Sequence, residues 1–163
     1  MLKKKVCMIG APGVGKTSLV RRFVEGIFGE RYHTTLGVKI DRKVVRVGDR
    51  DVLLVLWDIA GMDELSTLSQ AYLRGTSGLL LVADGTRGET LDAVLRLERS
   101  ARESVGDAHS ILLLNKVDLA EQWDVDPSID ASPPSDAPTY KTSAKTGLNV
   151  EPAFVRLATQ LAA

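Results

Sequence analysis

The sequence predicts an α/β protein built on a doubly wound, mostly parallel sheet. Short and nearly continuous apolar runs recur at residues 6–10, 52–57, 78–84 and 111–115. Strands of this kind are typically covered on both faces, as in parallel sheets with flanking helices. Stretches with helical spacing separate the runs, so strands and helices alternate along the chain. This alternation favours parallel strands joined by crossover helices.

A further apolar run, at residues 38–47, alternates with polar residues instead of being continuous. The turn sequence Gly48-Asp49-Arg50 follows it and leads directly into the next run. We therefore expect 38–47 and 51–58 to form an antiparallel hairpin at one side of the sheet. A short strand at 139–141 completes six expected strands, of which one edge strand is antiparallel.

Three helices are expected between these strands. The first spans residues 16–25 and opens directly from a glycine-rich turn. The second spans 87–105 and ends at Gly106, which is a plausible C-cap; its apolar residues recur at spacings near three and four, at Leu91, Val94, Leu95, Ala101 and Val105. The third spans 150–161, with one stripe formed by Val150, Phe154, Leu157 and Leu161. The Pro-, Ser- and Asp-rich segment 124–139 is expected to be a loop with at most a turn or two of helix.

The composition indicates one globular domain over residues 1–163. Lys plus Arg and Asp plus Glu both number 21, so the net charge gives no argument for nucleic-acid binding. The lysines at 3–5 are interpreted as a solvated lead-in to the first strand. A single cysteine, Cys7, fits a reducing, cytoplasmic compartment. Neither a signal peptide, nor an apolar stretch of ~20 residues, nor a lipidation motif is evident, so no stable membrane anchor is expected.

The segment GAPGVGKTS, residues 10–18, follows the first apolar run and precedes a helix. It fits the phosphate-binding pattern G-x-x-x-x-G-K-[ST] in the required strand–loop–helix context. Glycines allow close backbone approach, and successive N–H groups with the helix N-terminus attract phosphate. Lys16 can reach the β- and γ-phosphates, and Thr17 can offer its hydroxyl to Mg²⁺. The expected phosphate contacts are Gly13, Val14, Gly15, Lys16, Thr17 and Ser18.

Two further motifs indicate which nucleotide binds. NKVD occupies residues 115–118 after one apolar run, and TSAK occupies 142–145 after the expected short strand. The glycine-rich phosphate-binding loop at residues 10–18, called the cradle below, precedes these two motifs along the chain. The three motifs in this order resemble those of the Ras-like small GTPases, and the resemblance covers nearly the whole chain. The resemblance implies the three-layer P-loop GTPase fold with helices on both faces of the sheet. It also implies GTP and GDP as ligands with Mg²⁺ as cofactor, and the missing lipid signal suggests an unanchored, bacterial-type member.

The same resemblance implies roles for the base-binding residues. Asp118 would accept two hydrogen bonds from the guanine edge. Adenine lacks this donor pair, so it would leave the carboxylate partly unsatisfied, which costs about 1–3 kcal/mol of binding free energy. Asn115 would brace the loop against the cradle, and Lys116 would lie along the purine. The Ala144 N–H would meet the guanine O6. The remaining expected contacts are Ser143 and Lys145, which would hold the second loop, and Phe28, which would stack on the base.

The metal and γ-phosphate contacts follow from the resemblance in the same way. Mg²⁺ would be held by Thr17, by Thr35 and, through water, by Asp58 at the end of a strand. Thr34 is an alternative to Thr35, although Gly37 and Val38 favour Thr35. The Gly61 N–H would meet the γ-phosphate. Lys16, Thr35 and Gly61 are therefore the expected catalytic contributors.

Two departures from the family pattern bear on hydrolysis. Met62 stands where relatives usually carry a glutamine that orients the attacking water, and a thioether cannot donate a hydrogen bond. Met62 could alternatively pack beneath its loop or meet an apolar partner. Pro12 stands where many relatives have glycine, which removes one N–H and adds a rigid ring. The sequence assigns no arginine to catalysis, because Arg31 and Arg74 are candidates by loop position alone.

These features predict a GTP-binding switch with slow hydrolysis. Loops near 27–38 and 60–75 would be ordered by the γ-phosphate and would signal to effector, exchange and activating proteins. A rival interpretation is a GTP-bound interaction module that does not turn over, which Met62 and Pro12 favour. A nucleotide kinase is a third and weaker hypothesis, because the NKVD and TSAK motifs have no known role in such an enzyme.

Overall fold

The computed structural model describes residues 1–26, 38–59 and 67–163 of the chain. Its centre is a six-stranded sheet in the order β2-β3-β1-β4-β5-β6. The strands are β1 (Leu2–Ile9), β2 (Val38–Val47), β3 (Arg50–Ile59), β4 (Gly78–Asp84), β5 (His109–Asn115) and β6 (Thr139–Lys141). Only the β2–β3 pair is antiparallel among these strands, and the other four pairings are parallel. The predicted doubly wound sheet and its edge hairpin are confirmed.

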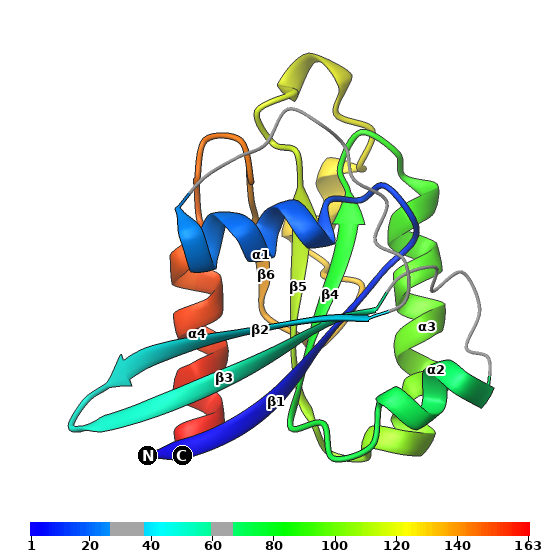
Figure 1. Cartoon of the computed structure of the whole chain (residues 1–163). Coiled ribbons are helices and arrows are strands. Elements are labelled where there is room, and N and C mark those ends of the chain that lie inside the picture. Colours follow the sequence, from blue (N-terminus) through cyan, green and yellow to red (C-terminus); the bar gives the residue numbers. More distant parts are fainter. Residues whose placement is uncertain (27–37, 60–66) are drawn as a thin grey trace.

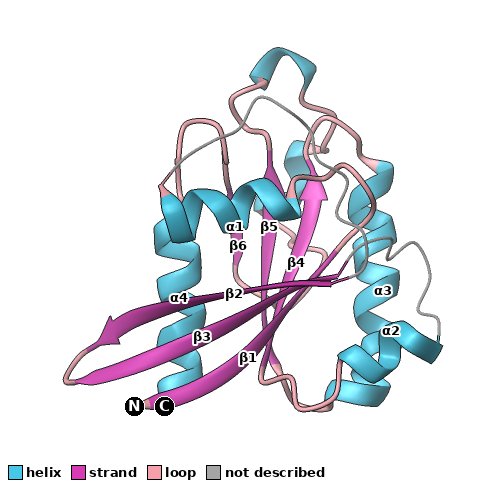
Figure 2. Ribbon diagram, in the orientation of Figure 1, coloured by secondary structure: helices cyan, strands magenta, loops and turns pink. Residues whose placement is uncertain are grey.

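Helices cover both faces of this sheet (Figure 1). On one face lie α1 (Lys16–Glu25) and α4 (Val150–Ala162), and on the other lie α2 (Thr67–Tyr72) and α3 (Glu89–Val105). The ribbon coloured by secondary structure shows the strands as a layer between these two pairs of helices (Figure 2). The fold is therefore the three-layer α/β arrangement that the alternation of runs and helices predicts.

The central strands are buried because their apolar runs are continuous. Every residue of β4 is buried, and so are the last five residues of β5. Even-numbered residues of β1, such as Val6 and Met8, pack on the α1/α4 side, whereas Cys7 and Ile9 pack on the α3 side. The apolar stripe predicted for the last helix belongs to the hydrophobic core on the α1/α4 side of the sheet. Helix α3 ends at Gly106, whose N–H donates to the Arg102 carbonyl, as the C-cap interpretation predicted.

The lysines at residues 3–5 lie within β1 and pair with β3, so they are not a lead-in to the strand. Lys3 is exposed, as the solvated interpretation predicted, but Lys5 is half-buried and has partners. The Lys5 ammonium lies 3.9 Å from the centre of the Trp57 ring and donates to the carbonyls of Tyr72 and Arg74, the latter at 2.6 Å. A lysine stem can cover apolar surface while its charge finds partners, so a strand can contain it.

Two irregular segments differ in how well the sequence predicted them. Segment 124–139 contains a single 3₁₀ turn, Pro127–Asp130, preceded by another at Ala120–Gln122, which confirms a loop with little helix. The described part of the expected switch segment near 60–75 includes a short helix, α2 at Thr67–Tyr72, which the sequence did not predict. Tyr72 packs partly buried beside Trp57, so tertiary contacts stabilise a helix too short to be stable alone.

Phe154 of α4 tests the packing on the α1 side of the sheet. It is fully buried and stacks on Phe23 of α1 with ring centroids 4.0 Å apart. We expect Phe154→Ala to lower the free energy of unfolding by about 3–5 kcal/mol, because a large cavity remains. Chemical denaturation measures this. Leu148→Ala, at a position 53% exposed, is the control, and equal losses in both variants would contradict the packing described.

Candidate nucleotide-binding site

The glycine-rich loop follows the carboxyl end of β1, which is the topological switch point of the sheet. Segments β3 and β4 flank β1 on opposite sides, and crevices at such positions are common ligand sites in α/β folds. At Gly10 the backbone has φ +155°, and a Cβ there would lie 2.3 Å from the Val82 carbonyl oxygen of β4. Only glycine therefore allows the loop to leave β1 at this point.

Side-chain donors hold five successive backbone carbonyls of this loop. The Lys16 ammonium donates to the carbonyls of Gly10 at 2.8 Å and Ala11 at 3.3 Å. The remaining three bonds come from other parts of the chain: Arg87 to Pro12 at 3.0 Å, Lys116 to Gly13 at 2.9 Å and Asn115 to Val14 at 3.0 Å. In a planar trans peptide the C=O and the next N–H point in opposite directions. Fixing these carbonyls therefore fixes the direction of the amides of Ala11, Gly13, Val14 and Gly15.

Asn115 joins this cradle to the two loops at the ends of β5 and β6. Its amide nitrogen donates to Val14, while its oxygen accepts from the Thr142 hydroxyl at 3.2 Å and the Ala144 N–H at 3.3 Å. The side chain is 2% exposed, so these bonds are shielded from water. The predicted bracing role of Asn115 thus has a matching geometry.

Lys116 is held by the buried carboxylate of Asp84. Lys116 adopts φ +70°, which is unusual for a residue with a side chain, and its ammonium lies 2.8 Å from Asp84 Oδ2. Burial raises the pKa of the Asp84 carboxyl, but hydrogen bonds from Lys116, Thr86 and Arg87 outweigh burial and lower that pKa overall. Because the pKa is lowered in the folded state, this stabilisation is present above the ordinary carboxyl pKa and is lost as pH falls through the folded one.

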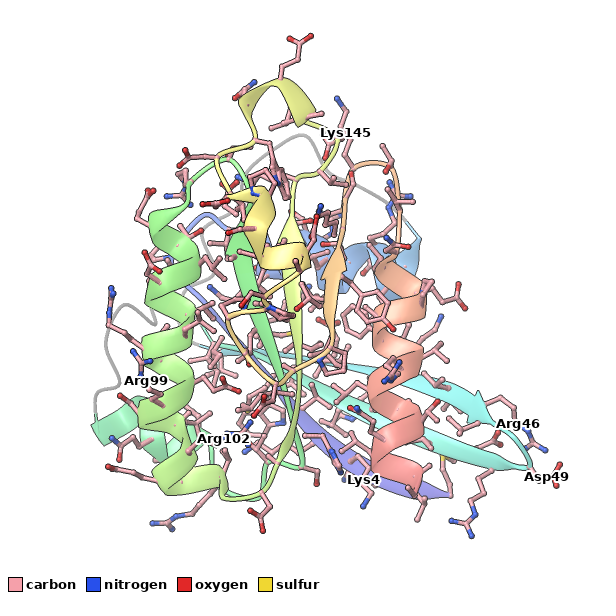
Figure 3. The ribbon with its side chains drawn as sticks, turned by 180° about the vertical axis from the view of Figure 1, so that it is seen from behind. Lys4, Arg46, Asp49, Arg99, Arg102 and Lys145 are labelled. Carbon is pink, nitrogen blue, oxygen red and sulfur yellow. The ribbon has the colours of Figure 1, made fainter. Side chains whose placement is uncertain are left out.

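Asp118, the acid predicted to read the base, is held by the TSAK loop. Ser143 is fully buried, and its hydroxyl donates to Asp118 Oδ1 at 2.7 Å. The Ala144 N–H, expected to meet a base oxygen, donates to Asn115 over a long 3.3 Å bond that such an oxygen could replace. Lys145 itself is exposed (Figure 3), and Arg22 of α1 holds its carbonyl and that of Ala144, the latter at 2.8 Å.

Thr17 and Asp58 come together beside the cradle. The Thr17 hydroxyl lies 2.5 Å from Asp58 Oδ2, although the two residues belong to α1 and β3. A hydroxyl and a carboxylate are hard oxygen ligands of the type that Mg²⁺ takes together with phosphate oxygens and water. The residues present therefore fit this metal. Within the described ranges no group of three His, Cys, Asp or Glu side chains offers a metal site.

Several predicted residues lie outside the described residues. They are Phe28, Arg31, Thr34, Thr35, Gly61 and Met62, and their roles stay predictions. Arg74 is described and exposed, and its carbonyl accepts from Lys5 in the middle of β1. Val14 has its side chain in the core and its carbonyl on Asn115, and Ser18 is half-buried in the first turn of α1.

Sequence reasoning missed three residues of this site: Arg22, Asp84 and Arg87. Asp84 ends β4, and a polar residue at the carboxyl end of a buried strand was a usable signal. Arg22 and Arg87 carried no signal, because an arginine on a helix or in a loop is usually solvated. Their roles depend on which carbonyls the fold brings near them.

A nucleotide cradle at the end of β1, joined by one asparagine to two loops at the neighbouring strand ends, is the arrangement of P-loop GTPases. A model of the Ras family matches residues 5–163, and the chain belongs to that family. The chain is 35% identical to "Ras-related protein Rab-30" of Homo sapiens over 160 residues, covering 96% of this chain and 79% of the relative. It is 33% identical to "Ras-related protein RAB1BV" of Beta vulgaris, with 94% and 74% covered. "GTP-binding protein YPTM1" of Zea mays is 34% identical, with 94% and 75% covered. The fold and the small-GTPase class are thereby confirmed.

One negative finding concerns membranes. Among the helices that the structure describes, none combines the length and the apolar character needed to cross a bilayer.

Gly15 tests whether the cradle requires the contact with Asn115. Gly15 has φ +105°, and a Cβ there would lie 2.3 Å from the Asn115 amide nitrogen. We expect Gly15→Ala to abolish nucleotide binding or weaken it at least about 100-fold, because the cradle must separate from Asn115. Titration with a fluorescent GDP analogue measures this.

Gly48→Ala is the matched control for this experiment. Gly48 also has a positive φ, +57°, but a Cβ there would meet nothing within 4 Å. Unaltered affinity in Gly15→Ala, or an equal loss in Gly48→Ala, would contradict the geometry described.

Proposed function

We propose that this protein is a guanine-nucleotide switch that binds GTP and GDP tightly and hydrolyses GTP slowly. The observation that carries the proposal is Asn115, which holds the Val14 carbonyl of the cradle and the Ala144 amide of the TSAK loop at once. Phosphate binding and base recognition then belong to one site. Membership of the Ras family supports the same class of activity.

The phosphate end of this site would use backbone amides and one lysine. The amides of Gly13, Val14, Gly15, Thr17 and Ser18 would bind the β-phosphate, aided by the N-terminus of α1. Lys16, which is 7% exposed and donates to two loop carbonyls, would extend its charge to the β- and γ-phosphates. Thr35 and Gly61 would complete the γ-phosphate contacts.

The base end would select guanine through Asp118. Its carboxylate, held by Ser143, would accept the paired N–H groups of the guanine edge. Lys116 and Phe28 would cover the two faces of the purine, and the Ala144 N–H would donate to O6. Lys145 would support this loop through its backbone, which Arg22 holds.

Mg²⁺ would be held by Thr17, by Thr35 and by Asp58 through water. When bound, this ion neutralises charge that develops on the phosphate oxygens. The closeness of the Thr17 hydroxyl and the Asp58 carboxylate supports this donor set.

Slow hydrolysis follows from what Met62 cannot do. An amide at this position can accept from and donate to the attacking water, whereas a thioether offers no donor. Pro12 adds a rigid ring beside the expected γ-phosphate position. An activating protein could supply the missing groups, and loops near 27–38 and 60–75 would report the γ-phosphate to effector and exchange proteins.

The second candidate is a GTP-bound module that does not turn over, and Met62 with Pro12 is what favours it. The two candidates differ in the nucleotide that copurifies. Copurified GDP supports turnover, and copurified GTP supports the stalled module.

Asp118 provides the test of base selection. Purified protein should bind GDP at least about 100-fold more tightly than ADP. Asp118→Asn should lose about tenfold or more in GDP affinity and gain xanthosine diphosphate binding, because its amide presents a donor to the xanthine 2-oxygen. Asp107→Asn, an exposed acid before β5, is the control. Equal affinities for GDP and ADP would overturn the proposed function.

Met62 provides the test of hydrolysis. We expect a single-turnover rate at or below ~10⁻⁴ s⁻¹, the order of unassisted switches. Met62→Gln should raise this rate about tenfold or more, whereas Met62→Leu should leave it low, because leucine restores no amide. Quench-flow or phosphate-release assays measure both. A wild-type rate well above that order, or equal rates for the two variants, would refute the interpretation of Met62.

A further inference from the structure

We propose that Arg87 is a positioning residue for nucleotide binding, which acts by aiming the Gly13 amide of the cradle. This inference rests on the proposed function and deepens it, because it assigns control of nucleotide release to a residue outside the expected motifs. Arg87 lies in the loop between β4 and α3, more than seventy positions along the chain from the cradle.

The contacts of Arg87 fix its guanidinium at both sides. Its Nε lies 3.1 Å from Asp84 Oδ2, and one terminal nitrogen donates to the Pro12 carbonyl at 3.0 Å. Asp84 is 1% exposed at its side chain and is itself anchored, because Thr86 donates to its other oxygen from both backbone and hydroxyl. A planar guanidinium bound in this way has little rotational freedom left.

Pro12 explains why this contact matters. Proline has no N–H, so the peptide group between Ala11 and Pro12 offers the nucleotide no donor. The first donor after it is the Gly13 N–H, which belongs to the peptide group whose carbonyl is that of Pro12. Gly13 has φ +78° and is glycine, so the backbone alone does not hold this peptide plane. Arg87 supplies the missing constraint from outside the loop.

The loop that carries Arg87 is itself rigidly packed. A Cβ at Gly85 would lie 1.9 Å from the Trp123 ring, so the ring rests directly on the backbone there. The Asp124 N–H donates to the Gly85 carbonyl at 2.7 Å, and the Gly88 N–H donates to Asp124 Oδ2 at 2.8 Å. The segment after NKVD thus clamps the Arg87 loop at both ends.

Asp84 also couples Arg87 to the base side of the site. Its Oδ2 accepts from Arg87 and from Lys116, and these two cations hold the adjacent carbonyls of Pro12 and Gly13. Removing Arg87 leaves the Lys116–Asp84 pair in place. Loss of the guanidinium should therefore weaken phosphate binding while base selection is retained.

The experiment measures release of a fluorescent GDP analogue, chased with excess GDP in the presence of Mg²⁺. We expect Arg87→Ala to release it about tenfold faster than wild type, the effect of losing one charge-assisted hydrogen bond. Arg87→Lys should recover part of the slow release, because an ammonium can reach one of the two partners. Arg99→Ala, an exposed arginine on α3 visible in Figure 3, is the control and should match wild type.

A second readout separates positioning from a general loosening of the fold. The ratio of the GDP affinity to the inosine diphosphate affinity reports base recognition by Asp118. Inosine lacks the 2-amino group, which is one of the two donors that Asp118 would bind. Faster release with an unchanged ratio supports the inference. Unchanged release in Arg87→Ala, or a ratio that falls together with affinity, overturns it. If wild type binds no GDP at all, the proposed function itself fails, which distinguishes the two outcomes.

Discussion

The planar trans peptide is the constraint on which this site depends. A phosphate cradle needs several N–H groups pointing at one place, and a short glycine-rich loop does not enforce that arrangement by itself. Here each carbonyl from Gly10 to Val14 is bonded to a side-chain donor. Because each carbonyl fixes the following amide, these donors orient the amides that would bind phosphate.

The fold explains where these donors come from. Parallel strands β1, β4 and β5 end at the same edge of the sheet, so the residues that follow them meet there. Lys16 follows β1, Arg87 follows β4, and Asn115 with Lys116 lies at the end of β5. The packing of these buried strands therefore places the polar residues that follow them close to one another.

Buried charge at this edge is stabilised by pairing. An isolated buried carboxylate is costly, but Asp84 receives bonds from Lys116, Arg87 and Thr86. The same bonds that hold the cradle carbonyls therefore also stabilise the buried Asp84 carboxylate.

Much of the fold could be predicted from the sequence, because continuous apolar runs and alternation report burial directly. The environment of Lys5 and helix α2 could not, since they depend on tertiary contacts with Trp57 and Tyr72. In the site, Lys16, Asn115 and Asp118 were predicted from motifs of fixed spacing. Arg22 and Arg87 were not, because their function is to hold backbone carbonyls, and backbone carbonyls leave no pattern in a sequence. The cytoplasmic location and the bacterial type expected from the sequence remain predictions.

Amide hydrogen exchange in the GDP-saturated protein measures whether side chains outside the loop orient its amides. Exchange at residues 13–17 should be slow in wild type, and exchange at Gly15 should be at least about tenfold faster in Asn115→Ala, with the interior of β4 unchanged. The Val14 carbonyl held by Asn115 belongs to the same peptide group as the Gly15 amide. Equal protection of Gly15 in both proteins would contradict the claim that side chains outside the loop orient its amides.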